Sequence, residues 1–260
     1  VLYLAFMLLL GLNYTRMPLS QTMNIPVERR SKEDLHSVCL ILVEQLNIAR
    51  ENVAEDENGV MIPGSSISNI LKTGYLGFWE VNDEYEILRI PKLRAKGVLA
   101  SRYWSYTGIV GMYFPFFVEA NVNTDVVNAY IPSTVLHELA HLIGVAREDE
   151  AEFVSFITGI NHPDPDFIYS AYLSAYHHAA NALFREDREM HANVSSKRSD
   201  GVRRDMTAAR EYWKQFEGPV RQTSTAVNNA YLQTNLQPDG VKSYGRVVDL
   251  ILGYYLGDER

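Results

Sequence analysis

Apolar residues recur along most of the chain at the three- and four-residue spacing of amphipathic helices. The clearest helix begins at Ser31, where Asp34 completes a capping pattern, and runs to about Ala54. The same spacing predicts further helices over residues 67–88, 151–160, 167–184, 203–216, 220–233 and 244–256, with glycines at 74 and 77 interrupting the first of them. Residues 13–25 are typical of a linker, and residues 55–66 and 161–166 of loops.

The pattern changes at Tyr103, where aromatic and β-branched residues mix with glycines. Residues 106–114 and 116–122 predict a hairpin or a short sheet, and residues 123–125 predict a turn after it. A thickly apolar helix follows, beginning near Pro132. The whole pattern predicts an α+β fold that is predominantly helical, with a small sheet directly before this last helix.

That helix carries the motif His137-Glu138-Leu139-Ala140-His141, which reads H-E-x-x-H. Residues four apart share one face of a helix, so both imidazoles can bind one ion. Glu138 lies beside them and can act on a water without ligating the metal. A helix that carries two histidines by chance is the alternative, but such groups are costly in an apolar helix unless something satisfies them. We therefore expect zinc ligands at His137 and His141 and a general base at Glu138.

The third zinc ligand is expected in the segment after the motif. Gly144 allows the helix to end and turn, after which Glu148 can come back toward the metal. Glu148 and Glu152 are four residues apart and face the same way, so both are candidates. Arg147 stands where a metzincin-like site would carry a histidine, which argues against that class.

The segment from Glu148 to Glu152 resembles the E-x-x-A-[DN] signature that supplies the third glutamate in several gluzincin-type peptidase families. The resemblance implies Glu148 as the ligand and Glu152 as an acid that braces a ligating histidine. Over essentially the whole chain, the order of motifs is similar to that of a bacterial family with a domain-of-unknown-function label, regarded as membrane-anchored zinc peptidases. The shared motifs are Gly11–Tyr14, Tyr113–Phe116, Glu119–Asn123, the H-E-L-A-H stretch, R-E-D-E-A-E-F after it, and Asp239–Arg246.

Residues 1–12 contain no charged side chain, and twelve residues are too few to cross a bilayer. By itself this run fits the outer end of a transmembrane helix, the apolar region of a cleaved signal, or a core helix. The resemblance implies transmembrane helices upstream and a globular part outside the cytoplasm. We therefore expect residues 1–12 to end a transmembrane helix in the cell membrane, and residues 13–260 to form an extracytoplasmic, zincin-like metallopeptidase domain.

The net charge and the cysteine content argue against several other partners and kinds of site. The formal net charge of −8 and the lack of basic clusters argue against a nucleic-acid partner. The single cysteine, Cys39, excludes an internal disulfide and any zinc site built from several cysteines. It lies in the apolar run 38–43, so we expect a buried structural thiol.

The expected reaction is zinc-dependent hydrolysis of a peptide bond in a peptide or protein substrate. Metal-activated water attacks, and Glu138 takes its proton and passes it to the leaving amine. Zincins hold substrate as an added strand beside the metal, so Glu119, Ala120 and Asn121 are the candidate substrate-binding edge. Candidates for stabilising the oxyanion, each also explicable as a packed or surface residue, are Tyr169, Tyr172, His177, His178 and Arg147. His162 is a further candidate ligand in a looser place.

Two alternatives keep the metal but change the function. The first is a zinc-stabilised sensor or scaffold domain of a membrane protein that hydrolyses nothing; Glu138 argues against it, because a structural ion has no use for a general base. The second is a di-iron bundle built on Glu138-x-x-His141 and Glu33-x-x-His36, which would leave His137 without a role. Metal analysis separates one zinc per chain from two irons.

Overall fold

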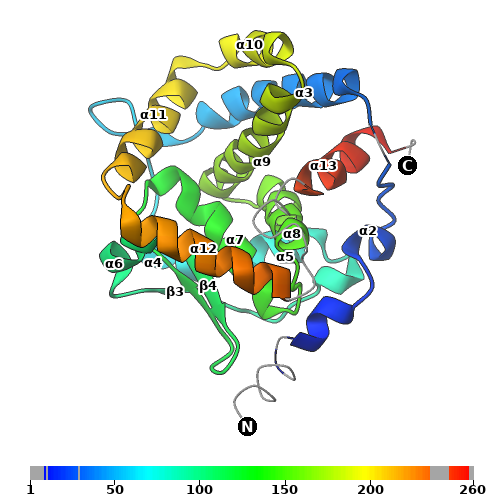
Figure 1. Cartoon of the computed structure of the whole chain (residues 1–260), viewed down its shortest axis with the longest axis vertical. Helices are drawn as coiled ribbons and strands as arrows, with labels where there is room; N and C mark the ends of the chain where they lie inside the picture. The colour runs from blue at the N-terminus through cyan, green and yellow to red at the C-terminus, as the bar shows by residue number, and fades with distance from the viewer. Residues whose placement is uncertain (1–8, 10, 29, 235–245, 258–260) are drawn as a thin grey trace.

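Helices dominate the structure, a computed structural model that describes residues 9, 11–28, 30–234 and 246–257 (Figure 1). The longer helices are α3 (Lys32–Arg50), α7 (Ile131–Leu142), α8 (Glu148–Ile160), α9 (Pro165–Glu186), α10 (Arg188–Ser196), α11 (Asp200–Lys214), α12 (Pro219–Thr234) and α13 (Val247–Leu256). Shorter ones are α2 (Leu19–Thr22), α4 (Ile67–Thr73), α5 (Tyr75–Val81), α6 (Ser101–Thr107) and the 3-10 turns η1 (Gly11–Thr15), η2 (Glu86–Leu88) and η3 (Asn128–Tyr130). The predicted α+β fold, predominantly helical with small sheets, is confirmed.

Two small sheets complete the fold. Strands β1 (Ala54–Glu55) and β2 (Met61–Ile62) form an antiparallel pair. The other sheet has the order β3-β5-β4, in which β5 (Glu119–Val122) runs parallel to β3 (Lys96–Gly97) and antiparallel to β4 (Gly111–Phe114). The predicted hairpin is therefore confirmed over 111–122, and the strand order leaves β4 at an edge.

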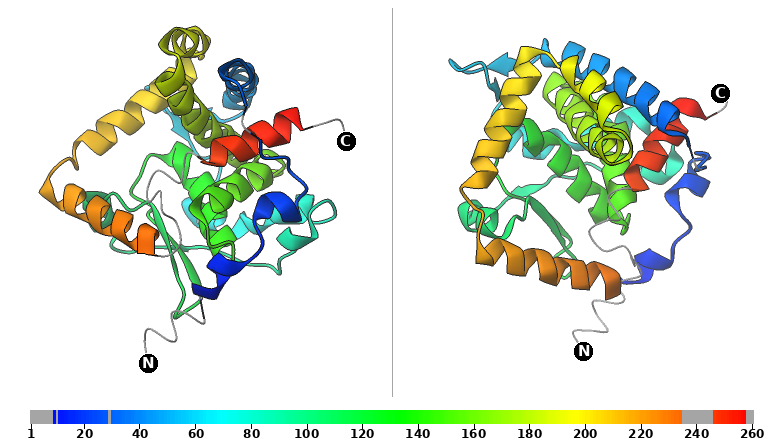
Figure 2. Two further views of the ribbon diagram at one scale, coloured as in Figure 1. Left: turned by 45° about the vertical axis from the view of Figure 1, so that its right-hand side comes forward. Right: turned by 45° about the horizontal axis from the view of Figure 1, so that its top comes forward.

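The core is built around α7. This helix contacts α8, α9, β4 and β5, and its apolar side chains Val135, Leu136 and Leu139 are fully buried. Helices α3 and α9 pack against each other, and Figures 1 and 2 show them side by side. Pro132 stands in the first turn of α7, where its missing N–H costs no helical bond. Because α7 is covered on several faces, polar groups on it must find their partners inside the protein.

Two local predictions are wrong. The first residues of the strand expected over 106–114 belong instead to helix α6, whose buried face is formed by Ser101 and Ser105 at helical spacing while Tyr103 and Tyr106 stay exposed. The single helix expected over 67–88 divides at Gly74 into α4 and α5. A Cβ at Gly74 would lie 2.6 Å from Cγ1 of Val135, so the division accompanies a close approach to α7.

Helix α11 is fastened to the core through a buried carboxylate. Asp205 is fully buried, and its Oδ2 accepts hydrogen bonds from Nε of Arg50 at 2.6 Å and from the Tyr169 hydroxyl at 2.5 Å. Its Oδ1 accepts from the backbone N–H of Met61 at 2.7 Å. One carboxylate thus joins α3, α9, α11 and β2, and it satisfies a buried guanidinium that would otherwise be costly.

Several predictions fall outside the described residues. The expected end of a transmembrane helix covers residues 1–12, of which the structure describes 9, 11 and 12. In the part of the chain that the structure describes, no helix combines the length and the apolar composition needed to cross a bilayer. The C-terminal motif Asp239–Arg246 is described only at Arg246, and the expected helix 244–256 is observed over Val247–Leu256.

Candidate metal centre

The turn that ends α7 brings the third acidic candidate toward the two histidines. Gly144 adopts a φ of +98°, a left-handed conformation that favours glycine, and reverses the chain after α7. Helix α8 then begins at Glu148, where a negative charge is favoured by the helix dipole. The predicted return of Glu148 toward the H-E-x-x-H helix is therefore observed, and it depends on the turn at Gly144.

Three ligand atoms converge at this turn. Nε2 of His137 lies 3.0 Å from Nε2 of His141, and Oε2 of Glu148 lies 3.2 Å from the former and 3.5 Å from the latter. Offering one atom each, the three side chains lie within 4.8 Å of one another. Within the described residues, His137, His141 and Glu148 thus form a group that could hold a metal ion.

The opposite ring nitrogens are tied to other acceptors. Nδ1 of His141 lies 2.7 Å from the carbonyl oxygen of Val145, and Nδ1 of His137 lies 3.1 Å from Oε2 of Glu152. A carbonyl oxygen can only accept, so Nδ1 of His141 carries the hydrogen and Nε2 of the neutral ring presents a lone pair. Nδ1 of His137 likewise carries a hydrogen, because an ionised Glu152 carboxylate can only accept. With both rings neutral, their Nε2 lone pairs would face Glu148, and three acceptors would face one another, as they must to share a cation.

The residues present fit a divalent cation. Burial alone would lower the pKa of His137, but its bonds to Glu148 and Glu152 raise that pKa well above its usual value. Burial alone would raise the pKa of Glu148, but the charges of the two histidines lower it. The cluster therefore favours positive charge at its centre, and a cation shared among the three side chains would supply it.

Glu152 lies on the far side of His137 and is itself held in place. Its Oε1 accepts a hydrogen bond from the Ser174 hydroxyl of α9 and lies 3.5 Å from Nε2 of His178. Burial would raise the pKa of Glu152, but His137 and His178 lower it well below its usual range. An ionised Glu152 thus orients His137 through Nδ1, whereas Glu148 faces the Nε2 atoms. Geometry separates the two candidate ligands and favours Glu148.

Glu138 is buried beside the cluster and touches the sheet. The residue is 4 % exposed, and its Oε2 has no hydrogen-bond partner among the described protein atoms. Burial raises the pKa of Glu138 to about 7, although the nearby histidines oppose the shift. On the other side of the carboxylate lies Gly111 of β4, where a Cβ would stand only 2.3 Å from Oε1 of Glu138. The backbone of β4 therefore lies directly against this carboxylate.

The strand that touches Glu138 is β4, whereas the substrate edge expected from sequence lies in β5. Glu119, Ala120 and Asn121 belong to β5, which is bonded to β4 on one side and to β3 on the other. Asn121 pairs with both neighbours, and Glu119 is further engaged in an ion pair with Lys96. Among the described strands, β4 is the edge strand next to the cluster. A glycine within a strand pattern was the signal for a close backbone approach here.

The candidates for oxyanion stabilisation do not gather at the cluster. Tyr169 donates to Asp205, Tyr172 packs against Phe156, and Arg147 pairs with Glu150 at 3.3 Å. His178 lies behind Glu152, on the side away from the Nε2 atoms. No contact of His177 with the three ligand atoms appears among the described residues.

Two further predicted histidines have structural partners. His162 stacks on Phe167, with ring centroids 3.8 Å apart, and its Nε2 lies 3.1 Å from the carbonyl oxygen of Thr73. His36 bonds Asn193 of α10, and Glu33 is exposed in the first turn of α3. Neither His162 nor the Glu33–His36 pair belongs to the group at His137, so the di-iron arrangement is not assembled.

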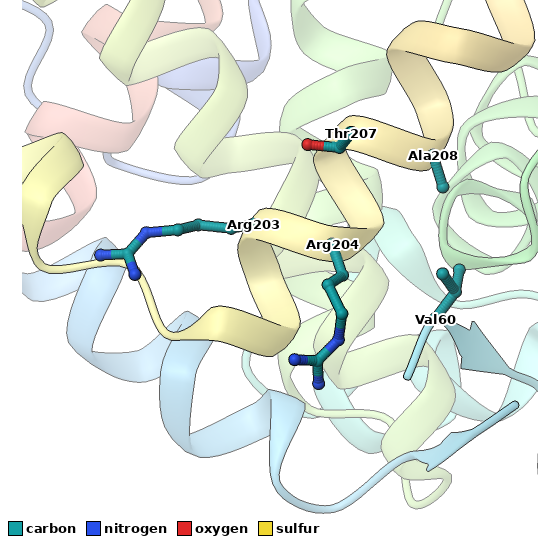
Figure 3. Close-up of a pocket in the computed structure, with 5 residues that line it drawn as sticks. All are labelled: Val60, Arg203, Arg204, Thr207 and Ala208. Atoms are coloured by element: carbon teal, nitrogen blue, oxygen red, sulfur yellow. The ribbon is translucent and has the colours of Figure 1, made fainter. Parts of the chain in front are cut away.

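A shallow cavity of about 390 Å³ lies apart from this centre, lined by Val60, Arg203, Arg204, Thr207 and Ala208 (Figure 3). The two guanidinium groups point in different directions. Arg203 pairs with Asp200 at 2.7 Å, and Nε of Arg204 donates to the carbonyl oxygen of Gly59 at 2.7 Å. Both arginines are therefore engaged within the fold, and we assign no ligand to this cavity.

Comparisons with known proteins place the chain in a family without describing its chemistry. No curated protein and no solved structure matches the chain. A family model does match, over residues 1–252, and its description is "Protein of unknown function (DUF3810)". A match over nearly the whole length shows membership: the chain belongs to the DUF3810 family.

Proposed function

We propose that the protein is a zinc-dependent peptidase with a zincin-like arrangement of helix and edge strand. The observation that carries the proposal is the convergence of Nε2 of His137, Nε2 of His141 and Oε2 of Glu148, with the carboxylate of Glu138 buried beside them. Two imidazoles and one carboxylate on an H-E-x-x-H helix are a donor set that zinc takes in hydrolytic sites.

Zinc is favoured over other ions by the kinds of ligand. Imidazole nitrogen suits zinc, copper, iron and nickel, whereas calcium and magnesium require sites built mainly from oxygen. Three protein ligands also leave a coordination position for water, as catalytic zinc sites do and closed structural sites do not. When bound here, zinc would supply Lewis acidity toward a water and a scissile carbonyl.

Glu138 is suited to the role of general base. A base works best when its pKa lies near the operating pH, and burial raises the pKa of Glu138 to about 7. Its Oε2 is buried and has no partner among the described protein atoms, so it can accept a proton from water and pass it to the leaving amine. Glu152, Ser174 and Val145 hold the two imidazoles in orientation and take no part in the proton transfer.

The edge of β4 is the proposed place for the substrate backbone. An extended peptide can add to the sheet there through main-chain hydrogen bonds, which read no particular side chain. Gly111 lets this edge run directly against Glu138, so the bond to be cleaved would lie beside the base and the ligand cluster. We prefer the edge of β4 to residues 119–121, because Asn121 pairs with both β3 and β4 and Glu119 and Ala120 pair with β4.

The test is Glu138→Gln, with bound zinc measured beside hydrolysis. A peptide-library digest by the zinc-loaded protein, followed by mass spectrometry, first identifies a cleaved peptide. The glutamine variant should retain zinc and lose hydrolysis, because it keeps the shape of the side chain and removes the base. Unchanged hydrolysis would contradict the role of Glu138. Retained zinc without any cleavage by the parent protein would favour the non-proteolytic sensor or scaffold.

The ligand assignment has its own matched pair of variants. Glu148→Ala removes a proposed ligand, and Glu152→Ala removes the brace behind His137, four residues along the same helix. Zinc affinity should fall far more for the first than for the second, for which a 10- to 100-fold loss is typical. The reverse order would move the ligand assignment to Glu152.

A further inference from the structure

The turn between β4 and β5 exposes apolar side chains in a row. Phe116, Phe117 and Val118 are 40, 70 and 54 % exposed. Val118 also has a φ of +53°, a conformation that a β-branched residue rarely adopts. Strain of this kind persists where the surroundings enforce it, and it clusters at functional segments. We call Phe116, Phe117 and Val118 the hairpin tip.

The tip itself carries no charged residue, and none occurs in the sequence between Arg102 and Glu119. Glu119, which directly follows Val118, has its charge paired with that of Lys96. The tip therefore presents two phenyl rings and a valine, which a hydrocarbon environment accepts and an aqueous surface disfavours.

The 3-10 turn η1 lies against the same hairpin. Tyr14 of η1 and Ala146 form a small buried cluster against which Tyr113 of β4 packs. In Figure 1 and in the left view of Figure 2, the hairpin and η1 lie toward the same end of the molecule. Leu12 of η1 is 53 % exposed, and the sequence carries no charge before Arg16. Two uncharged segments far apart in the sequence thus meet at one end.

We propose that the hairpin tip inserts into the surface of a lipid bilayer together with η1. A second copy of the chain or another protein would be expected to offer the tip a groove, but η1 packs against β4 and belongs to a stretch of sequence without a charge before Arg16, which favours hydrocarbon. The net charge of −8 and the absence of basic residues at the tip mean that apolar transfer, not attraction to anionic headgroups, drives the contact.

This docking places the metal centre near the membrane. The carbonyl oxygen of Gly144, in the turn that carries Val145 beside His141, accepts a hydrogen bond from Nη1 of Arg16 at 3.2 Å. The other side of the centre is β4, whose turn is the tip itself. Resting on the proposed peptidase function, this geometry selects as substrates peptide segments that are presented at the membrane surface.

Insertion is tested with the full chain and vesicles of phosphatidylcholine, a neutral lipid. In a Phe117→Trp variant, lipids brominated in the acyl chain should quench the added indole emission beyond the quenching seen for the parent's own three tryptophans. Val227→Trp is the matched control, because Val227 is 65 % exposed on α12. Its added indole should not be quenched. An unquenched Phe117→Trp variant would overturn the proposal.

A second pair of variants measures the contribution of the tip to binding. Phe116→Ser with Phe117→Ser should lower partitioning onto the vesicles at least tenfold, since two aromatic side chains lose their transfer from water. Val220→Ser with Val227→Ser, which changes two exposed apolar residues on α12, should leave partitioning unchanged. Equal partitioning of both doubles, or burial of the tip between two copies without vesicles, would overturn the proposal.

A separate cleavage experiment tests the substrate class independently of lipid binding. The cleaved peptide is offered in two forms, free in solution and attached to a lipid in the same vesicles. The parent protein should prefer the attached form, and the Phe116→Ser, Phe117→Ser variant should lose this preference while cleaving the free peptide at the parent rate. Loss of cleavage of both forms would refute this use of the tip, whereas absence of cleavage by the parent would refute the proposed function and leave the vesicle results standing.

Discussion

Gly111→Ala tests whether the edge strand holds the general base in position. A Cβ at residue 111 would lie 2.3 Å from Oε1 and 2.7 Å from Cδ of Glu138, whereas ordinary van der Waals contact begins at 3.4 Å. The carboxylate must therefore move by about 1 Å, or the strand must move away from α7. A displacement of that size in a catalytic group typically costs about 100-fold in rate. We expect kcat for the cleaved peptide to fall by about that factor.

The assay pairs kcat and KM with zinc content and thermal unfolding. Zinc should be retained in Gly111→Ala, because the contact is with Glu138 and not with His137, His141 or Glu148. Gly218→Ala is the control, since a Cβ at residue 218 would meet nothing within 4 Å. Parent-like kcat in a folded, zinc-loaded Gly111→Ala protein would refute the reasoning. Loss of zinc in that variant would show that β4 supports the ligands and not the base.

Three further predictions concern stability and the thiol. Asp205→Ala should lower the free energy of unfolding in urea by about 3–5 kcal/mol, because it removes the buried partner of the Arg50 guanidinium and leaves that group with the exposed Glu55; a loss below 1 kcal/mol would contradict this. Ser31→Ala should lower it by about 1 kcal/mol through the lost cap of α3, and an unchanged urea midpoint would count against the cap. Cys39 is fully buried and burial raises its pKa to about 12, so a thiol reagent should label it only after denaturation; labelling of the native protein would show that α3 opens.

The sequence predicted the group of His137, His141 and Glu148 because its parts are local. His137, Glu138 and His141 are fixed by helical spacing, and Gly144 marks the turn that returns Glu148. It left Glu148 and Glu152 as alternatives because two residues four apart on α8 face the same way. Their difference lies in which nitrogen of His137 each one meets, and that depends on the packing of α8 against α7.

The edge position of β4 could not be predicted from the sequence, because strand order depends on contacts between distant segments. Strand β3 has two residues and no alternating pattern, yet its pairing with Asn121 and Val122 makes β5 central and leaves β4 at the edge. Helix α6 was missed for a related reason. Its aromatic residues suggest a strand, but Ser105 turns inward to bond the hydroxyl of Tyr212 on α11.

The central claim is that His137, His141 and Glu148 together bind one zinc ion. Metal analysis of the purified full chain with zinc K-edge X-ray absorption tests this directly. The account predicts one zinc per chain, with scattering from two imidazoles at about 2.0–2.1 Å, a carboxylate oxygen and no sulfur. Two irons per chain, a sulfur ligand, or an undiminished zinc content after His137→Ala and His141→Ala would contradict it.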